Sequence, residues 1–396
     1  MSNLGNETKG FISARDLLAA TPEMQQRYGY ADTLREIRQQ PETWLGTAEL
    51  IRSTHVRELL RNVLSPQPTH IVLTGSGSSM YAGECLAPNL QSGLGLPVQS
   101  IASGTLLTHW SSVLPPGPGL LISLARSGDS PESCGVVSRL LADAPKYRHL
   151  VITCNASGKL ATSYAGDPRV SVLTLNERTN DRSLVMTSSF TNLVLAGTGL
   201  LTQSDSDVQA TARFADAVQR ILDDHAQALA ALAVEAFSNI VYLGSGGALG
   251  AAHESALKML EMTDGDVVTV AETYLGLRHG PMSSLNERTL IVGFLSSDPL
   301  VRAYEIDLLR ELKRKQLGIK QVLVGQDIPR DVLGAHDIAV LLPSMHTNDS
   351  VLPLLADVVV GQMLAFFRCI ASGGRPDTPS QGVLTRVVGD FPMHQG

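Results

Sequence analysis

Three residues suited to acid–base chemistry follow one glycine-rich turn in the second half of the sequence. Lys258 and Glu261 come after the turn at 244–247, and His279 follows within an Arg-His-Gly-Pro segment. Residues three apart lie on one face of a helix, so a carboxylate could remove a proton there while a lysine stabilises the charge that develops. The alternatives are a surface ion pair and a structural histidine, which are the more common arrangements when such residues stand alone.

Serine- and glycine-rich turns follow two apolar segments in the first half. Hydroxyl and backbone N–H groups that converge from two strand ends can bind a phosphate, and an arginine adds a forked charged donor. The alternative is that these are ordinary turn and helix-cap residues. Two such turns in one sheet favour an anion site, for which the candidates are Ser76, Gly77, Ser78, Ser79, Arg126, Ser127 and Ser130. Neither a Walker loop nor a complete GxGxxG motif with its acidic partner is present, so nucleotide binding is the weaker interpretation.

Apolar strands that alternate with helical segments must position these residues. The predicted strands are 70–75, 98–102, 120–125, 149–154 and 170–175 in the first half, and 239–244, 267–271, 290–295, 320–325 and 338–342 in the second. Continuously apolar strands of this kind form parallel sheets with both faces covered. The predicted fold is therefore α/β, with two doubly wound parallel sheets whose ligands bind at the carboxyl ends of the strands.

The two halves resemble each other at a nearly constant offset. The residue numbers of Ile71 and Ile240 differ by 169, as do those of Gly75 and Gly244, and two later strand pairs follow at offsets of 169 and 168. This period suits two similar domains and is too long for a solenoid. We predict an N-terminal helical extension (1–50, with helices at 22–27, 33–40 and 41–64), domains at 51–203 and 236–372, a linker helix at 204–235 that follows a polar join at 202–207, and a C-terminal tail (373–396).

Composition excludes several classes of protein. A formal charge of −7 without a Lys/Arg run disfavours nucleic-acid binding. The four cysteines show no CxxC spacing, which favours reduced buried thiols and a cytoplasmic protein. No metal-ligand spacing or cofactor motif is present. The segment 1–11 lacks the apolar region of a signal peptide, and 351–370 contains charges, which predicts a buried core helix and no membrane span.

Four short motifs together resemble the sugar isomerase (SIS) family. They are Thr74-Gly-Ser-Gly-Ser-Ser, Ala125-Arg-Ser-Gly-Asp-Ser, Ala256-Leu-Lys-Met-Leu-Glu261 and Arg278-His-Gly-Pro, and the likeness is to the isomerase half of glucosamine-6-phosphate synthase. The segments Arg35-Glu-Ile-Arg-Gln-Gln-Pro41 and Asn180-Asp-Arg-Ser-Leu-Val-Met-Thr-Ser-Ser-Phe190 resemble the AgaS branch, the galactosamine-6-phosphate deaminase/isomerases once named tagatose-6-phosphate ketose/aldose isomerases. The resemblance covers roughly residues 50–390.

The resemblance implies roles for individual residues. Glu261 would carry protons between carbons, Lys258 would be its neighbouring lysine, and His279 would open the sugar ring, donated across the interface of a homodimer or larger assembly. The sequence departs from the synthase in two places: Ala125-Arg126 replaces a Ser-Gln pair, and the tail lysine has no counterpart, so that Thr385 or Arg386 stands in the matching stretch.

The implied reaction converts galactosamine 6-phosphate and water to tagatose 6-phosphate and ammonia through an enolamine. A plain tagatose-6-phosphate aldose/ketose isomerase and a glucosamine-6-phosphate deaminase are alternatives that use the same base. A non-catalytic sugar-phosphate sensor is a further alternative, although the sequence shows neither a helix-turn-helix segment before the first domain nor a basic patch.

Overall fold

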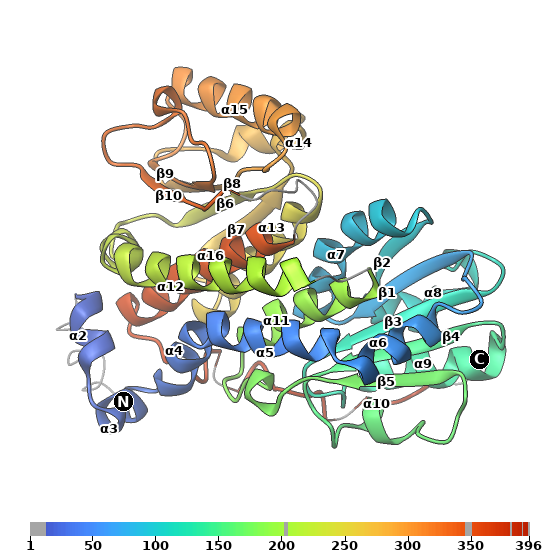
Figure 1. Cartoon of the computed structure of the whole chain (residues 1–396). Coiled ribbons are helices and arrows are strands. Elements are labelled where there is room, and N and C mark those ends of the chain that lie inside the picture. Colours follow the sequence, from blue (N-terminus) through green and yellow to red (C-terminus); the bar gives the residue numbers. More distant parts are fainter. Residues whose placement is uncertain (1–12, 202–204, 345–350, 381, 390, 395–396) are drawn as a thin grey trace. The chain divides into compact units, whose positions relative to one another are not determined.

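The computed structural model describes residues 13–201, 205–344, 351–380, 382–389 and 391–394. These residues form two compact units, each built on one sheet (Figure 1). The first-sheet unit consists of residues 42–181, 188–213 and 385 onward. The second-sheet unit consists of the residues up to 41, 182–187 and 214–384. The predicted domain ranges contain the two sheets, and their exact boundaries remain a prediction.

The first sheet has the strand order β2-β1-β3-β4-β5, with all neighbours parallel. Helices α8, α9 and α10 contribute buried side chains to the core on one face, and α6, α7 and α11 contact strands of the same sheet. The elements are β1 (His70–Gly75), α7 (Ser78–Leu94), β2 (Val98–Ala102), α8 (Ser103–Val113), β3 (Gly119–Ala125), α9 (Pro131–Asp143), β4 (Arg148–Thr153), α10 (Lys159–Thr162), β5 (Val170–Thr174), η2 (Glu177–Thr179), α11 (Ser188–Gly197) and η3 (Thr198–Leu200).

The second sheet has the order β10-β9-β8-β6-β7 and is also parallel throughout. Helices α14 and α15 pack on one face, while α13 contacts β6 and β7 and packs along α16. The elements are α12 (Asp205–Ala233), β6 (Asn239–Leu243), α13 (Gly247–Met262), β7 (Val268–Glu272), α14 (Tyr274–Leu277), η4 (Pro281–Ser284), β8 (Thr289–Phe294), α15 (Pro299–Arg314), β9 (Lys320–Gly325), η5 (Arg330–Val332), β10 (Ile338–Leu341) and α16 (Leu352–Ala371).

All ten predicted strands are confirmed to within one residue at each end. Strands β1, β3 and β8 are buried along their whole length, as expected for strands covered by helices on two sides. The two sheets share one strand order, in which the strand that comes first in the sequence lies between the second and the third. The predicted α/β fold with two doubly wound parallel sheets is confirmed.

The N-terminal helices differ from the prediction. They are α2 (Ala14–Ala19), α3 (Pro22–Tyr28), α4 (Ala31–Arg38), α5 (Gln40–Arg52) and α6 (Thr54–Val63). The single helix predicted from Pro41 to Leu64 is wrong, because Ser53 has non-helical backbone geometry and accepts a hydrogen bond from the Val56 backbone N–H, which caps a new helix. Helix α2 was not predicted. Residues 202–204 of the predicted join lie outside the described residues, and so do residues 1–12, 381, 390 and 395–396 of the predicted extension and tail.

Helix α16 is the buried core helix that the sequence predicts. Among the described residues it alone is long and apolar enough to cross a membrane, and 83% of its most apolar 18-residue window is buried. It packs closely on α13: glycine at position 361 leaves so little space that an added Cβ atom would lie 2.2 Å from the Ser255 hydroxyl oxygen. Of the free cysteines, Cys85, Cys154 and Cys369 are buried and Cys134 is half-buried.

The close contact between these helices leads to a stability prediction. Gly361→Ala is expected to lower the free energy of unfolding by about 1–3 kcal/mol, since α13 and α16 must separate to admit the methyl group. Gly46→Ala is the matched control, because Gly46 is an exposed position of α5 with nothing within 4 Å of an added Cβ. That change should stabilise the protein by up to about 1 kcal/mol. Urea unfolding measures both, and equal effects would contradict tight packing at Gly361.

Candidate active site

Helix α13 carries a buried row of charged side chains. Lys258 has no exposed surface, and its Nζ atom lies 2.5 Å from Oε2 of Glu261 and 3.4 Å from Oε1 of Glu254. Glu254, Lys258 and Glu261 are four and three residues apart, so all three lie on one face of the helix. The sequence analysis missed Glu254, although the acid–base–acid spacing along the helix was a usable signal.

Burial of Lys258 excludes the surface ion pair as an interpretation of this site. A lysine is buried fully only when charged or polar partners compensate its lost hydration, and here two carboxylates do so. The side chain of Glu261 keeps 21% of its surface exposed, so this carboxylate can meet a ligand while its other side is held by Lys258. Leu260 of the same helix is exposed, because the buried face of α13 includes charged residues.

His279 lies in the short loop between α14 and η4, and it is exposed. Its backbone N–H donates to the Gly276 carbonyl at 2.9 Å. The neighbouring Arg278 binds Oε2 of Glu311 on α15 through Nε at 2.8 Å. Lys315 and Arg278 lower the pKa of Glu311 to about 2, so this anchor of the loop is an ion pair at neutral pH. An exposed imidazole on an anchored loop is accessible to a ligand or to another subunit.

The first predicted anion-binding turn connects β1 to α7. Gly77 precedes the helix with a positive φ of 55°, and no side chain caps the helix start. Position 75 requires glycine because the first turn of α7 lies close to its backbone, and an added Cβ would lie 2.4 Å from the Ser79 Cβ. Ser78 and Ser79 are buried in the first turn of α7. A helix start that follows a glycine turn directs backbone N–H groups and a positive dipole toward an anion.

The second predicted turn connects β3 to α9. Ser127 Oγ accepts a hydrogen bond from the Asp129 N–H at 3.3 Å, and Asn155 binds the Ser127 carbonyl at 2.8 Å. Arg126 is buried beside the end of the strand. The Ser130 hydroxyl donates to Oε2 of Glu132 at 2.6 Å, so a phosphate bound by this hydroxyl must replace the carboxylate.

The two turns meet at one place in the first sheet, because β1 and β3 are parallel neighbours. In the order β2-β1-β3-β4-β5, strand β2 lies on one side of β1, and the later strands lie on the other side. Parallel α/β sheets bind ligands at this change of side, which here falls between β1 and β3. Ser76–Ser79 and Arg126–Ser130 are therefore called the first-sheet anion site. A chain of hydroxyls lies beneath it: Thr74 and Ser103 are 3.2 Å apart, and Ser103 and Ser133 are 3.3 Å apart.

Arg386 lies in the tail and binds two neighbouring residues of the first-sheet unit. Its guanidinium donates to Oδ1 of Asn180 at 2.6 Å and to the Asp181 backbone carbonyl. The thiol of Cys154 is buried just after β4, and burial raises its pKa to about 12. The positive charges of Arg126 and Arg386 oppose this increase in the pKa of Cys154. Two cations thus lie near the carboxyl ends of β3 and β4. The role of Arg386 in phosphate binding remains a prediction.

The structure groups the candidate residues in two sets. Lys258, Glu261 and His279 belong to the second-sheet unit, and the phosphate-binding candidates belong to the first-sheet unit. Within each set the residues lie on the elements that the sequence predicts. Among the described ranges, no three His, Cys, Asp or Glu side chains are arranged to hold a metal ion.

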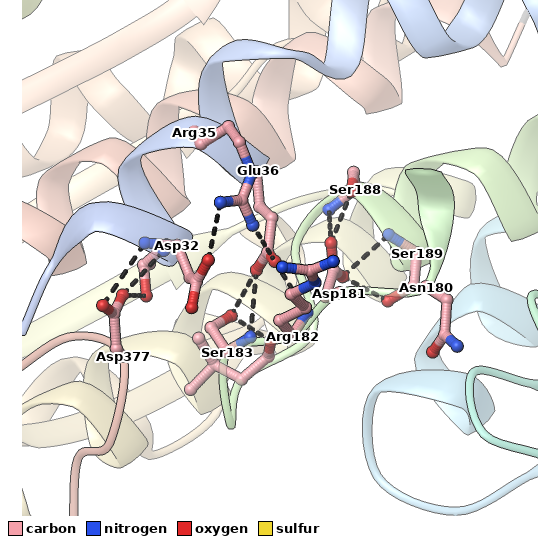
Figure 2. A network of polar contacts seen from close by, with 12 residues as sticks. Asp32, Arg35, Glu36, Asn180, Asp181, Arg182, Ser183, Ser188, Ser189 and Asp377 are labelled. Carbon is pink, nitrogen blue, oxygen red and sulfur yellow. Dashed lines mark hydrogen bonds and ion pairs between the residues drawn. The ribbon is translucent and has the colours of Figure 1, made fainter. Parts of the chain in front are cut away.

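The two segments that resemble the AgaS branch make structural contacts (Figure 2). In the second-sheet unit, buried Glu36 of α4 accepts hydrogen bonds from Arg182 N at 2.6 Å and from the Ser183 hydroxyl at 2.6 Å. Asp377 caps the same helix, accepting from Thr33 N at 2.7 Å. In the first-sheet unit, Asp181 accepts from the backbone N–H groups that begin α11, with Ser189 N at 2.8 Å. These motifs therefore stabilise the fold of each unit rather than supply reactive groups.

Asp357 of α16 is a buried acid whose ionisation should control stability. Burial raises its pKa well above the usual value, and nearby Glu305 raises it further. The folded state then binds this proton more tightly than the unfolded chain. Its contribution to stability is complete at acid pH and is lost as the pH rises toward the folded-state pKa.

Asp357→Asn tests this sign. The variant should unfold at a higher temperature than the original protein at about pH 8 and at the same temperature at about pH 4. Thermal unfolding followed by circular dichroism measures the difference. A variant that is less stable at pH 8 would mean that the carboxylate is stabilising when ionised.

Comparisons with known proteins identify the family. No protein-family model matches the chain. A Streptomyces coelicolor protein with the designation AgaS is 39% identical over 372 residues, which are 91% of this chain and 95% of that protein. An Escherichia coli protein named D-galactosamine-6-phosphate deaminase AgaS is 35% identical over 371 residues, again 91% and 95% of the two chains.

Solved structures agree with the sequence relatives. The crystal structure of tagatose-6-phosphate ketose/aldose isomerase from Escherichia coli is 34% identical and has a TM-score of 0.80, covering 87% of this chain and 95% of that one. The likeness extends across nearly the whole length of these relatives, and it includes both sheets. The chain belongs to the AgaS family of SIS-type amino-sugar-phosphate enzymes.

Proposed function

We propose that the chain converts D-galactosamine 6-phosphate and water to D-tagatose 6-phosphate and ammonia. The observation that carries the proposal is the partly exposed Glu261 carboxylate held by the buried Lys258 ammonium at 2.5 Å, in a chain that belongs to the AgaS family. A carboxylate fixed on one side and open on the other is suited to carry a proton between adjacent carbons of a bound sugar.

Substrate binding is assigned to the first-sheet anion site. Uncapped N–H groups at the start of α7, the hydroxyls of Ser78 and Ser79, and Arg126 together suit a dianionic phosphate. His279 acts on the ring oxygen and opens the sugar to its free aldehyde.

Proton transfer then moves the carbonyl function from C1 to C2. Glu261 removes the C2 proton to give an enolamine and returns a proton to C1, which leaves an imine at C2. Water adds to the imine carbon, ammonia leaves, and the water oxygen becomes the C2 carbonyl of the ketose. Lys258 lies against Glu261 and stabilises the negative charge that develops during enolisation.

A plain aldose–ketose isomerase is the second candidate, because the solved Escherichia coli relative carries that name. Incubation with galactosamine 6-phosphate, glucosamine 6-phosphate and tagatose 6-phosphate separates the candidates. The proposed activity releases one ammonia per tagatose 6-phosphate formed, and only from the galacto substrate. Release from glucosamine 6-phosphate would assign the gluco deaminase, whereas isomerisation of tagatose 6-phosphate without ammonia release would assign the isomerase. Binding without turnover of any substrate would leave the sensor.

The proposed enzyme is a cytoplasmic homodimer that needs no metal or cofactor and in which the partner subunit donates His279. Exposure of His279 on its anchored loop supports this arrangement. A mixture of Glu261→Gln and His279→Ala chains, unfolded and refolded together, should regain about a quarter of the original activity, because half of the dimers contain one intact site of two. Ammonia release measures the recovery. No recovery from mixed dimers would place both residues in one subunit's site.

A further inference from the structure

The second sheet contains a pair of turns with the same backbone geometry as the first-sheet anion site. Gly246 precedes α13 with φ 58° and ψ −127°, and Gly77 precedes α7 with φ 55° and ψ −126°. Strands β6 and β8 are parallel neighbours, as β1 and β3 are. We call residues 244–247 and 296–298 the second-sheet turn pair.

The second turn of this pair also matches its counterpart. Ser296 Oγ accepts from the Asp298 N–H at 3.1 Å, just as Ser127 accepts from Asp129 at 3.3 Å. The two serines, like the two aspartates, are related by the same offset of 169 in residue number that relates the strands. By backbone alone, the second-sheet turn pair would bind an anion as well as the first.

A carboxylate of the chain itself lies at the second-sheet turn pair. Glu305 of α15 is 1% exposed, and its Oε2 accepts a hydrogen bond from Ser296 N at 2.8 Å. The Ser245 side chain hydrogen-bonds to Glu305 as well, so both turns donate to one carboxylate. Burial raises the pKa of Glu305, while these two hydrogen bonds and the charge of Arg302 oppose the increase.

The corresponding position in the first half is apolar. Helices α9 and α15 begin at Pro131 and Pro299, an offset of 168, which pairs Glu305 with Val137, a residue that is buried in α9 and contributes to the core of the first sheet. A valine side chain cannot accept a hydrogen bond, so the first half has no counterpart of the Glu305 carboxylate at this position.

The helix starts differ in the same sense. Asp298 caps α15 by accepting from Leu300 N at 2.8 Å and Val301 N at 3.4 Å. Ser130 begins α9 without any side-chain cap. The N–H groups at the start of α15 are thus bound by a carboxylate, whereas those at the start of α9 have no side-chain cap.

We infer that Glu305 takes, at the second-sheet turn pair, the place that a phosphate takes at the first-sheet anion site, so that each chain binds one phosphate instead of two. The comparison rests on the proposed function, which makes the first site a phosphate site. Glu305 also joins the end of β8 to the turn that begins α13, and α13 carries Lys258 and Glu261.

Opening the second site tests the inference. Glu305→Val gives the second half the residue that the first half has at this position, and inorganic phosphate is the probe. We expect the thermal unfolding midpoint of Glu305→Val to rise about twice as much as that of the original protein over one phosphate series, because two sites bind instead of one. Chloride at equal ionic strength controls for screening.

Leu309→Ala is the matched control. Leu309 lies one turn further along α15 and is buried in the same core, so its truncation destabilises the unit without emptying the turn pair. Its response to phosphate should equal that of the original protein. Equal responses of Glu305→Val and Leu309→Ala would overturn the inference.

A crystal structure of the unaltered full chain grown in phosphate provides a second measurement, which does not require any variant to fold. Glu305 bound to Ser296 with no anion between the second-sheet turns supports the inference, and an anion there with Glu305 displaced overturns it. Failure of the proposed function is a separate result, because it would appear as an absence of ammonia release by the original protein.

Discussion

Glu261→Gln should reduce the rate constant for ammonia release by about 100- to 10,000-fold while leaving KM for the sugar phosphate nearly unchanged. Glutamine keeps the shape of the side chain and can still accept a hydrogen bond from Lys258. It cannot take the C2 proton, so the loss falls on the chemical step rather than on binding. Coupled measurement of ammonia at saturating galactosamine 6-phosphate gives kcat directly.

The control for this change is Glu42→Gln. Glu42 is an exposed carboxylate on α5 that binds Arg178 through two hydrogen bonds, 2.6 and 2.7 Å long. An exposed pair of this kind is worth about 0–1 kcal/mol, and kcat should not change. Ammonia release by Glu261→Gln at a rate near that of Glu42→Gln would show that Glu261 is not the base.

Lys258→Met should lower the free energy of unfolding by about 3–5 kcal/mol and also remove activity. Methionine fills a similar volume but leaves Glu254 buried beside an apolar chain, without the ammonium group that lies 3.4 Å from its carboxylate. Removing one partner of a buried ion pair costs much more than the pair itself contributes to stability. Denaturant unfolding at neutral pH measures the loss.

The double variant Glu254→Gln/Lys258→Met separates the buried charge from loss of packing. With the carboxylate neutralised, most of the lost stability should return, giving a coupling energy of about 1–3 kcal/mol between the two changes. If Lys258→Met alone costs less than about 1 kcal/mol, the pair behaves as a surface ion pair, and the buried arrangement on α13 is wrong.

The sheets could be predicted from sequence because each strand is a short continuous apolar run bounded by glycine or polar residues. The constant offset of 169 between matching positions further constrained the two halves. The N-terminal helices could not be delimited as well, since the break at Ser53 depends on one serine that caps a helix in an otherwise helical segment. Ser53 is followed by Val56 with no glycine or proline to mark the end.

The sequence predicts which helix and turns carry the candidate residues, but it does not predict what surrounds them. Spacing placed Lys258 and Glu261 on one helix face, yet burial of α13 depends on α16, which is distant in sequence. The hydrogen bond from the Ser130 hydroxyl to the Glu132 carboxylate could not be predicted from sequence. The same Ser-Pro-Glu spacing also fits a helix start at which the serine hydroxyl makes no such bond. Glu305 could have been noticed by aligning the halves, because it corresponds to the buried valine Val137 of α9.

Attachment of α4 to Asp377 has a consequence for the order in which the molecule is made. The carboxylate that caps this helix is 344 residues further along the chain than Thr33, and ribosomes add roughly 5–20 residues per second. The helix around Thr33 therefore emerges about 20–70 s before its cap exists. Until Asp377 has been added to the chain, the Thr33 backbone N–H at the start of α4 lacks this acceptor.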